Sequence, residues 1–170
     1  RRDDWRGVGE LILSSAQKLA ASGAEFLICP DNTIHQALPH IHDRLPLPFL
    51  HIADVVAGEA ERRGFRKVGL TGTRYLVESA VYPKDFVRPT AEERAEINRI
   101  IFEELVYGVF KPEAVAYFQS VIERFKSEGC DAVALSCTEI PLIINDGNAA
   151  LPTLDSTRLL ARAALERAVS

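Results

Sequence analysis

Apolar residues along this chain follow two spacings, one typical of helices and the other of buried strands. Residues 5–22 carry apolar side chains three and four positions apart, which predicts an amphipathic helix. Short runs that are mostly apolar predict strands buried in a sheet, at residues 25–29, 49–52, 67–70, 131–135 and 152–154.

Helix-starting and helix-breaking residues separate these strands. Residues 33–44 have a helical pattern that Pro39 is expected to kink or break. Thr90 and Glu93 have the spacing of a capping box, which predicts the start of a helix. We expect further helices at residues 53–63, 74–81, 90–107 and 112–128, and from the N-cap Asp155 onward. Alternating strands and helices predict an α/β fold with mainly parallel sheets flanked by helices.

Two stretches of the chain repeat one pattern. Residues 23–33 and 129–139 each contain a glycine, a small residue, an acid, four apolar residues and then a small polar cluster. The clusters fall at the carboxyl ends of the expected strands, where open α/β sheets bind their ligands. In this register Asp31 occupies the position of Cys137. The repeat therefore predicts two similar halves whose reactive side chains face each other across a substrate.

Composition excludes several classes of protein. The net charge is −4, and the lysines and arginines are scattered, so no nucleic-acid partner is expected. No apolar run reaches the roughly 18 residues of a membrane helix. Three cysteines without paired spacing indicate reduced thiols in a cytoplasmic protein. The sequence contains no methionine and has no strand before its first helix, from which we expect that an N-terminal strand is missing.

Five segments, in order along residues 5–168, resemble the cofactor-independent aspartate/glutamate racemase family: residues 30–35, 72–74, 100–105, 136–141 and 154–157. The resemblance implies two similar, pseudo-symmetric α/β lobes with the active site between them. We expect lobe 1 to comprise residues 1–51 plus 152–170, and lobe 2 to comprise residues 52–151. The expected partners are a small-molecule substrate, either an acidic amino acid or a dicarboxylate, and a second copy of the chain in a homodimer. No cofactor or metal is expected.

Three features depart from the family pattern. The family usually has cysteine directly before Asn-Thr, where this chain has Asp31. Cys29 lies two residues earlier, inside the expected strand, and is predicted to belong to the core. Residues 82–87 form a shorter connection than the family has, and the family's first strand with its glycine-rich turn is absent from the sequence.

Racemisation without a cofactor needs two groups, one that removes the α-proton and one that returns a proton on the opposite face. Cys137 is expected to be the first, as a thiolate favoured by the N–H groups of a helix that follows it. Asp31 is expected to be the second; it is a weaker base than a thiolate, and burial would strengthen it. We expect the substrate to be bound by Asn32, Thr33, Thr73, Thr138 and Glu139.

Other interpretations of these residues stay open. Cys137 alone could be a buried structural thiol, residues 31–33 could only cap a helix, and Glu139 could be a first-turn acid favoured by a helix dipole. Relatives with a single cysteine decarboxylate or isomerise small dicarboxylates. A carboxylate-binding protein that has lost turnover is the non-enzymatic alternative.

Overall fold

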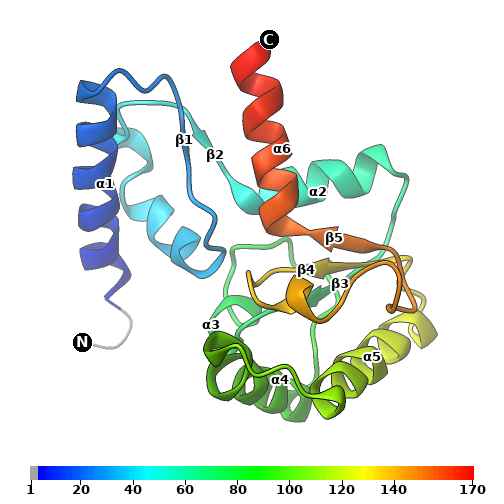
Figure 1. Cartoon of the computed structure of the whole chain (residues 1–170). Coiled ribbons are helices and arrows are strands. Elements are labelled where there is room, and N and C mark those ends of the chain that lie inside the picture. Colours follow the sequence, from blue (N-terminus) through cyan, green and yellow to red (C-terminus); the bar gives the residue numbers. More distant parts are fainter. Residues whose placement is uncertain (1–3) are drawn as a thin grey trace.

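The structure, a computed structural model, describes residues 4–170 and contains two parallel sheets with helices around them (Figure 1). The smaller sheet lies in the N-terminal third of the chain. The larger one collects strands from the middle and the end of the chain. The predicted α/β class with parallel sheets is therefore confirmed. Residues 1–3 of the expected first lobe lie outside the described residues.

The smaller sheet pairs β1 (Leu27–Ile28) with β2 (Phe49–Leu50), with Leu27 opposite Phe49. The predicted first helix is confirmed as α1 (Trp5–Ala21), capped by Asp4. Leu27 is buried, but Ile28 is 42% exposed. Burial of this strand on both faces was therefore a wrong prediction, because a groove between β1 and α1 leaves Ile28 uncovered.

Between these strands the chain forms two 3-10 segments, η1 (Thr33–His40) and η2 (His42–Arg44). The helical stretch predicted over residues 33–44 is thus present only in the tighter 3-10 form, and it is interrupted at Ile41. Pro39 lies inside η1 and has no N–H to continue an α-helical ladder, which explains the difference.

The middle of the chain supplies one strand and three α-helices. The helix predicted at residues 74–81 ends after a single turn, and the one predicted to reach residue 107 changes to a 3-10 turn after residue 103. The elements are α2 (Ile52–Arg62), β3 (Val68–Thr71), α3 (Arg74–Val77), α4 (Ala91–Glu103) and η3 (Leu105–Tyr107).

The last third of the chain closes the larger sheet and ends in a long helix. Its elements are α5 (Pro112–Ser127), β4 (Ala132–Leu135), η4 (Ile140–Leu142), β5 (Thr153–Asp155) and α6 (Ser156–Val169). The helix expected directly after Cys137 is only the 3-10 turn η4, which contains Pro141. Within residues 4–170, every helix is too short or too polar to cross a bilayer.

The larger sheet has the strand order β3-β4-β5, all parallel, with Leu70 opposite Ala134 and Ala134 opposite Leu154. Val87 extends it beyond β3: its N–H donates to Val68 O, and its carbonyl accepts from Leu70 N, both at 2.8 Å. This extension was not predicted, because residues 82–87 look like a connecting loop in the sequence.

Both faces of the larger sheet are buried, as its apolar runs predicted. Val133 and Leu135 pack in one cluster with Phe125 of α5, while Ala132 and Ala134 pack in another with Tyr82. A Cβ atom on Gly69 would lie 2.5 Å from the ring of Phe125. The close approach of α5 to the sheet therefore depends on glycine at this position.

The end of the chain joins the larger sheet. β5 hydrogen-bonds to β4, and α6 then packs against α2 (Figure 1). The strand at 153–155 thus shares a sheet with strands from the segment expected to form lobe 2. The division into residues 1–51 plus 152–170 and residues 52–151 stays a prediction.

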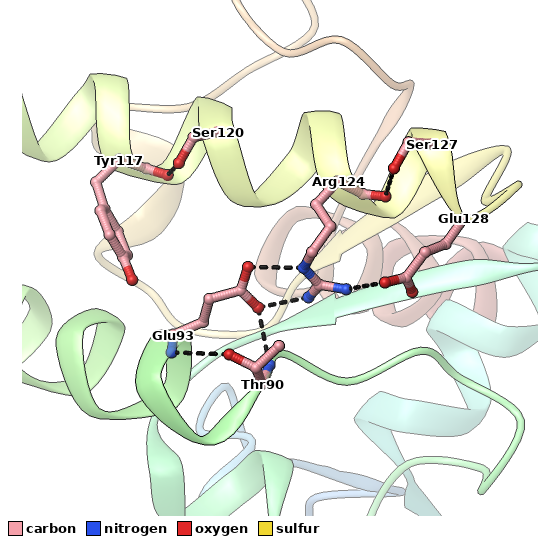
Figure 2. Close-up of polar contacts among 7 residues, drawn as sticks. All are labelled: Thr90, Glu93, Tyr117, Ser120, Arg124, Ser127 and Glu128. Carbon is pink, nitrogen blue, oxygen red and sulfur yellow. Dashed lines mark hydrogen bonds and ion pairs between the residues drawn. The ribbon is translucent and has the colours of Figure 1, made fainter.

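Ion pairs connect α4 to α5 on the outside of the larger sheet (Figure 2). The capping box of Thr90 and Glu93 is confirmed, with hydrogen bonds in both directions. The Glu93 carboxylate also accepts two hydrogen bonds from Arg124, which is paired with Glu128 as well. One acid therefore both starts α4 and orients α5 against it.

Candidate active site

A cavity of about 300 Å³ opens where the loops after β1, β3 and β4 meet. It lies at the carboxyl ends of the strands, as expected for an α/β protein. All seven residues singled out in the sequence line it: Asp31, Asn32, Thr33, Thr73, Cys137, Thr138 and Glu139. A larger hollow of about 740 Å³, beside Pro46 and Pro48, contains none of them, so size alone does not mark the site.

Cys137 follows the buried strand β4, and its Sγ lies 2.9 Å from Glu139 Oε2 as a hydrogen-bond donor. Burial raises the pKa of the Cys137 thiol, and the hydrogen bond to Glu139 and the charge of this carboxylate raise it further. The expected lowering of this pKa was therefore wrong. The physical reasons are burial and the neighbouring carboxylate of Glu139, and the expected α-helix is only the single turn η4.

Glu139 lies against Cys137, so its side chain points to the thiol within the cavity. Its Oε2 accepts hydrogen bonds from Cys137 Sγ and, at 2.7 Å, from Thr138 Oγ1. Burial alone would raise the pKa of Glu139, but these two hydrogen bonds and one from its own backbone N–H together outweigh burial, and the pKa is lowered. The carboxylate therefore stays ionised beside the thiol, and its expected role in substrate binding stays a prediction.

Asp31 enters the cavity from the loop after β1 and is exposed to solvent. One carboxylate oxygen, Oδ1, accepts from Ile34 N at 2.9 Å and so caps the turn that starts η1. Asp31 therefore caps a helical turn, as one of the interpretations of residues 31–33 expected. Asp31 and Cys137 line the same cavity, and the negative charge of Asp31 adds to the rise in the pKa of Cys137.

His35 holds the backbone of Asp31 in place. Ile52 N donates to His35 Nε2 at 3.3 Å, so the proton of the neutral ring is on Nδ1, which donates to Asp31 O at 2.7 Å. Burial, with a smaller contribution from the charge of His51, lowers the pKa of His35 to about 4. The buried ring of His35 therefore connects two backbone segments by hydrogen bonds.

Asn32 links the loops that carry Asp31 and Cys137. Its Nδ2 donates to Ser156 Oγ at 3.0 Å, and Ser156 Oγ donates to Leu135 O at 3.0 Å. Its Oδ1 accepts from Tyr82 OH at 2.7 Å. Tyr82 and Ser156 were not singled out as site residues. The only signal was the position of Ser156 within the motif at 154–157, and nothing local marks Tyr82.

Thr33 and Thr73 meet at the floor of the cavity from different parts of the chain. Their hydroxyl oxygens lie 3.2 Å apart, and Thr73 Oγ1 also accepts from Leu76 N as the cap of α3. With Thr138, three hydroxyl groups face one cavity. These hydroxyls can bind a carboxylate once they exchange their present partners for it, since Thr138 Oγ1 donates to Glu139 and the other two share one hydrogen bond.

No group of three or more histidine, cysteine or acidic side chains within residues 4–170 is arranged to hold a metal ion.

Comparisons with known proteins converge on one family. The sequence profile of the Asp/Glu/Hydantoin racemase family matches residues 1–164. A glutamate racemase of Thermus thermophilus is 31% identical over 166 residues, which are 95% of this chain and 59% of that protein. The broad specificity amino-acid racemase RacX of Bacillus subtilis is 25% identical, covering 89% of this chain and 68% of that protein.

A solved structure supports the same assignment. An aspartate racemase homologue from Pyrococcus horikoshii is 32% identical and superimposes with a TM-score of 0.88. The superposition covers 100% of this chain and 78% of the other. This chain thus spans between about three fifths and four fifths of the length of these relatives.

Proposed function

This chain belongs to the Asp/Glu/Hydantoin racemase family, and from that premise we propose that it is a cofactor-independent amino-acid racemase. The reaction is removal and return of the α-proton of a small acidic amino acid. The observation that carries the proposal is one cavity that is lined by both Asp31 and Cys137, which follow two different strands. Two groups able to exchange protons are what a two-sided reaction at one carbon requires.

The protonation states of Cys137 and Asp31 indicate which group gives up a proton and which takes one at the start of the reaction. The raised pKa keeps Cys137 a thiol near neutral pH, and its proton points to Glu139. With Asp31 as a carboxylate, the two groups differ by one proton. Asp31 removes the α-proton from one face of the substrate, and the Cys137 thiol delivers its proton to the other. For the opposite enantiomer, Cys137 acts as the thiolate and Asp31 as the acid.

Substrate binding lowers the cost of forming that thiolate. An amino-acid substrate carries an ammonium group, whose positive charge beside Cys137 and Glu139 would favour the charged form of the thiol. The hydroxyls of Thr33, Thr73 and Thr138 are proposed to bind the α-carboxylate, which holds the α-carbon between the two reacting groups. Asn32 adds the second N–H of its amide to this set.

The test is to follow the α-proton in heavy water. The protein is incubated with each enantiomer of aspartate and glutamate, and NMR measures loss of the α-proton while chiral chromatography measures inversion. We expect loss of the α-proton and inversion to occur at the same rate, apart from the kinetic isotope effect. Absence of exchange with both aspartate and glutamate would refute the proposal and leave a carboxylate-binding protein.

A second candidate follows from Asp31 standing at the position where the family usually has cysteine. A decarboxylase or isomerase with one cysteine delivers a proton to one face only. The same experiment distinguishes this candidate, because solvent deuterium would then enter one enantiomer without inversion. A parallel assay with small dicarboxylates measures release of carbon dioxide.

Cellular location and assembly are part of the proposal. All three cysteines are free thiols, which supports a reducing compartment such as the cytoplasm. A homodimer is proposed from the family resemblance, and light scattering coupled to gel filtration measures it directly.

A further inference from the structure

One wall of the cavity is apolar and partly uncovered. It consists of Tyr75, Ile101, Phe102 and Val106, which line the same cavity as Cys137. Tyr75, Phe102 and Val106 are 46%, 44% and 51% exposed. The rings of Tyr75 and Phe102 meet edge to face, with centroids 6.4 Å apart. We call these four residues the apolar wall.

The apolar wall is fixed next to the polar floor of the site. Gln36 Nε2 donates to both Tyr75 O and Thr33 O, so the wall and the floor share one hydrogen-bonding side chain. Asn98 of α4 accepts from Arg74 N and so ties α3 to α4. These hydrogen bonds connect the segments that carry the apolar wall to the segment that carries Thr33.

Charge around the cavity favours a neutral side chain against this wall. Among the described residues that line the cavity, the charged ones are Asp31 and Glu139, and both are negative. These lining residues offer no cation to an acidic side chain, whereas an apolar side chain gains from covering exposed aromatic surface.

We propose that the apolar wall binds the side chains of large apolar and aromatic amino acids, so that the enzyme racemises these in addition to acidic ones. The inference rests on the proposed function and adds a substrate class to it. The chemistry is unchanged: the α-carbon–hydrogen bond breaks as Asp31 takes the proton, and a new one forms with the proton of the Cys137 thiol. Solvent then restores both groups.

The test compares substrates and variants of the full chain. Exchange and inversion are measured in heavy water with phenylalanine, leucine, aspartate and glutamate. We expect phenylalanine and leucine to be inverted. Phe102→Ala should lower the ratio of kcat/KM for phenylalanine to that for aspartate about 10-fold, because contact with the apolar wall is lost. Phe102→Lys should lower it further by adding a cation for the acidic side chain.

Tyr107→Ala is the matched control. Tyr107 is an aromatic residue of η3, one position from Val106, that is 75% exposed and does not line the cavity. This variant should leave the ratio within about 2-fold of the parent, as surface substitutions away from a site usually do.

Four outcomes decide the proposal. Inversion of phenylalanine with the expected drop in Phe102→Ala supports it. Inversion of aspartate and glutamate only would overturn it and leave the proposed function standing, whereas no exchange with any amino acid would overturn both. If Phe102→Ala changes all substrates equally, or alters the oligomeric state in light scattering, the wall serves folding or a subunit contact and the proposal is wrong.

Discussion

The Cys137 side of the cavity follows β4, a strand whose four residues are all buried and which is hydrogen-bonded by β3 on one edge and β5 on the other. The Asp31 side follows β1, which has two residues and, among residues 4–170, pairs only with β2. Each of the two residues thus follows a strand, but the strand before Cys137 is paired on both edges, whereas the strand before Asp31 is paired on one.

Hydrogen bonds from buried side chains hold the Asp31 side of the site in place, as pairing within the sheet does on the Cys137 side. His35 binds the carbonyl of Asp31, and Asn32 is held by Tyr82 and Ser156. A two-residue strand can therefore present a reactive group when buried hydrogen bonds replace a longer ladder. Buried polar groups are costly to leave without a hydrogen-bond partner, which makes the Asp31 side sensitive to single substitutions and to pH.

The largest expected effect is on the Cys137 side. Cys137→Ser should lower racemisation at least about 10³-fold, because a hydroxyl is a much weaker acid and base than a thiol. The serine can still donate to Glu139, so the fold should persist. Racemisation kinetics with circular dichroism measure both. Cys130→Ala, which changes a buried cysteine outside the cavity, is the control. Cys137→Ser activity above a tenth of the parent value would remove Cys137 from the mechanism.

On the Asp31 side, Asp31→Asn should reduce inversion about 10²-fold, because an amide cannot accept the α-proton while its oxygen still caps η1. Asp31→Cys should keep or raise activity, since it restores the residue that the family usually has. The control is Asp54→Asn, which lies on α2 outside the cavity. Inversion at the parent rate in Asp31→Asn would show that only the Cys137 side exchanges protons.

A smaller effect concerns stability against pH. The pKa of His35 is lowered to about 4 in the folded protein. As the pH falls, the unfolded state therefore takes up this proton at a higher pH than the folded state does. The stabilisation is complete above about pH 6.5 and decreases as the pH falls toward about 4. His35 alone should reduce the free energy of unfolding by about 2 kcal/mol between pH 7 and pH 5. Urea titrations at several pH values measure this.

The matched comparison for that prediction is His35→Gln. Glutamine removes the titrating ring and can still pair with one of its two backbone partners, so the variant should be less stable at pH 7 but lose less stability on acidification. Identical pH dependence in the parent and His35→Gln would mean that His35 does not connect folding to pH. His40→Gln, an exposed change on the same 3-10 segment, should match the parent throughout.

Local patterns in the sequence predicted the strands of the larger sheet and the start of α4, and the family resemblance grouped the site residues. The apolar runs at residues 67–70 and 131–135 predicted strands buried on both faces, and the capping box of Thr90 and Glu93 predicted where α4 starts. Such signals depend on neighbouring residues and on burial, both of which the sequence carries. The repeat around Asp31 and Cys137 placed their polar clusters at the carboxyl ends of strands, where open α/β sheets bind ligands.

Only the tertiary structure decided what each group in the site meets. The pKa of Cys137 depends on its burial and on how Glu139 is oriented, and the hydrogen bonds of Asn32 depend on Tyr82, 50 positions away. The apolar wall likewise arises because α3 and α4 pack beside the loop after β1. These properties come from contacts between distant segments. The spacing of residues along a helix or strand predicts which of them share a face, but it does not predict which distant side chains pack against that face.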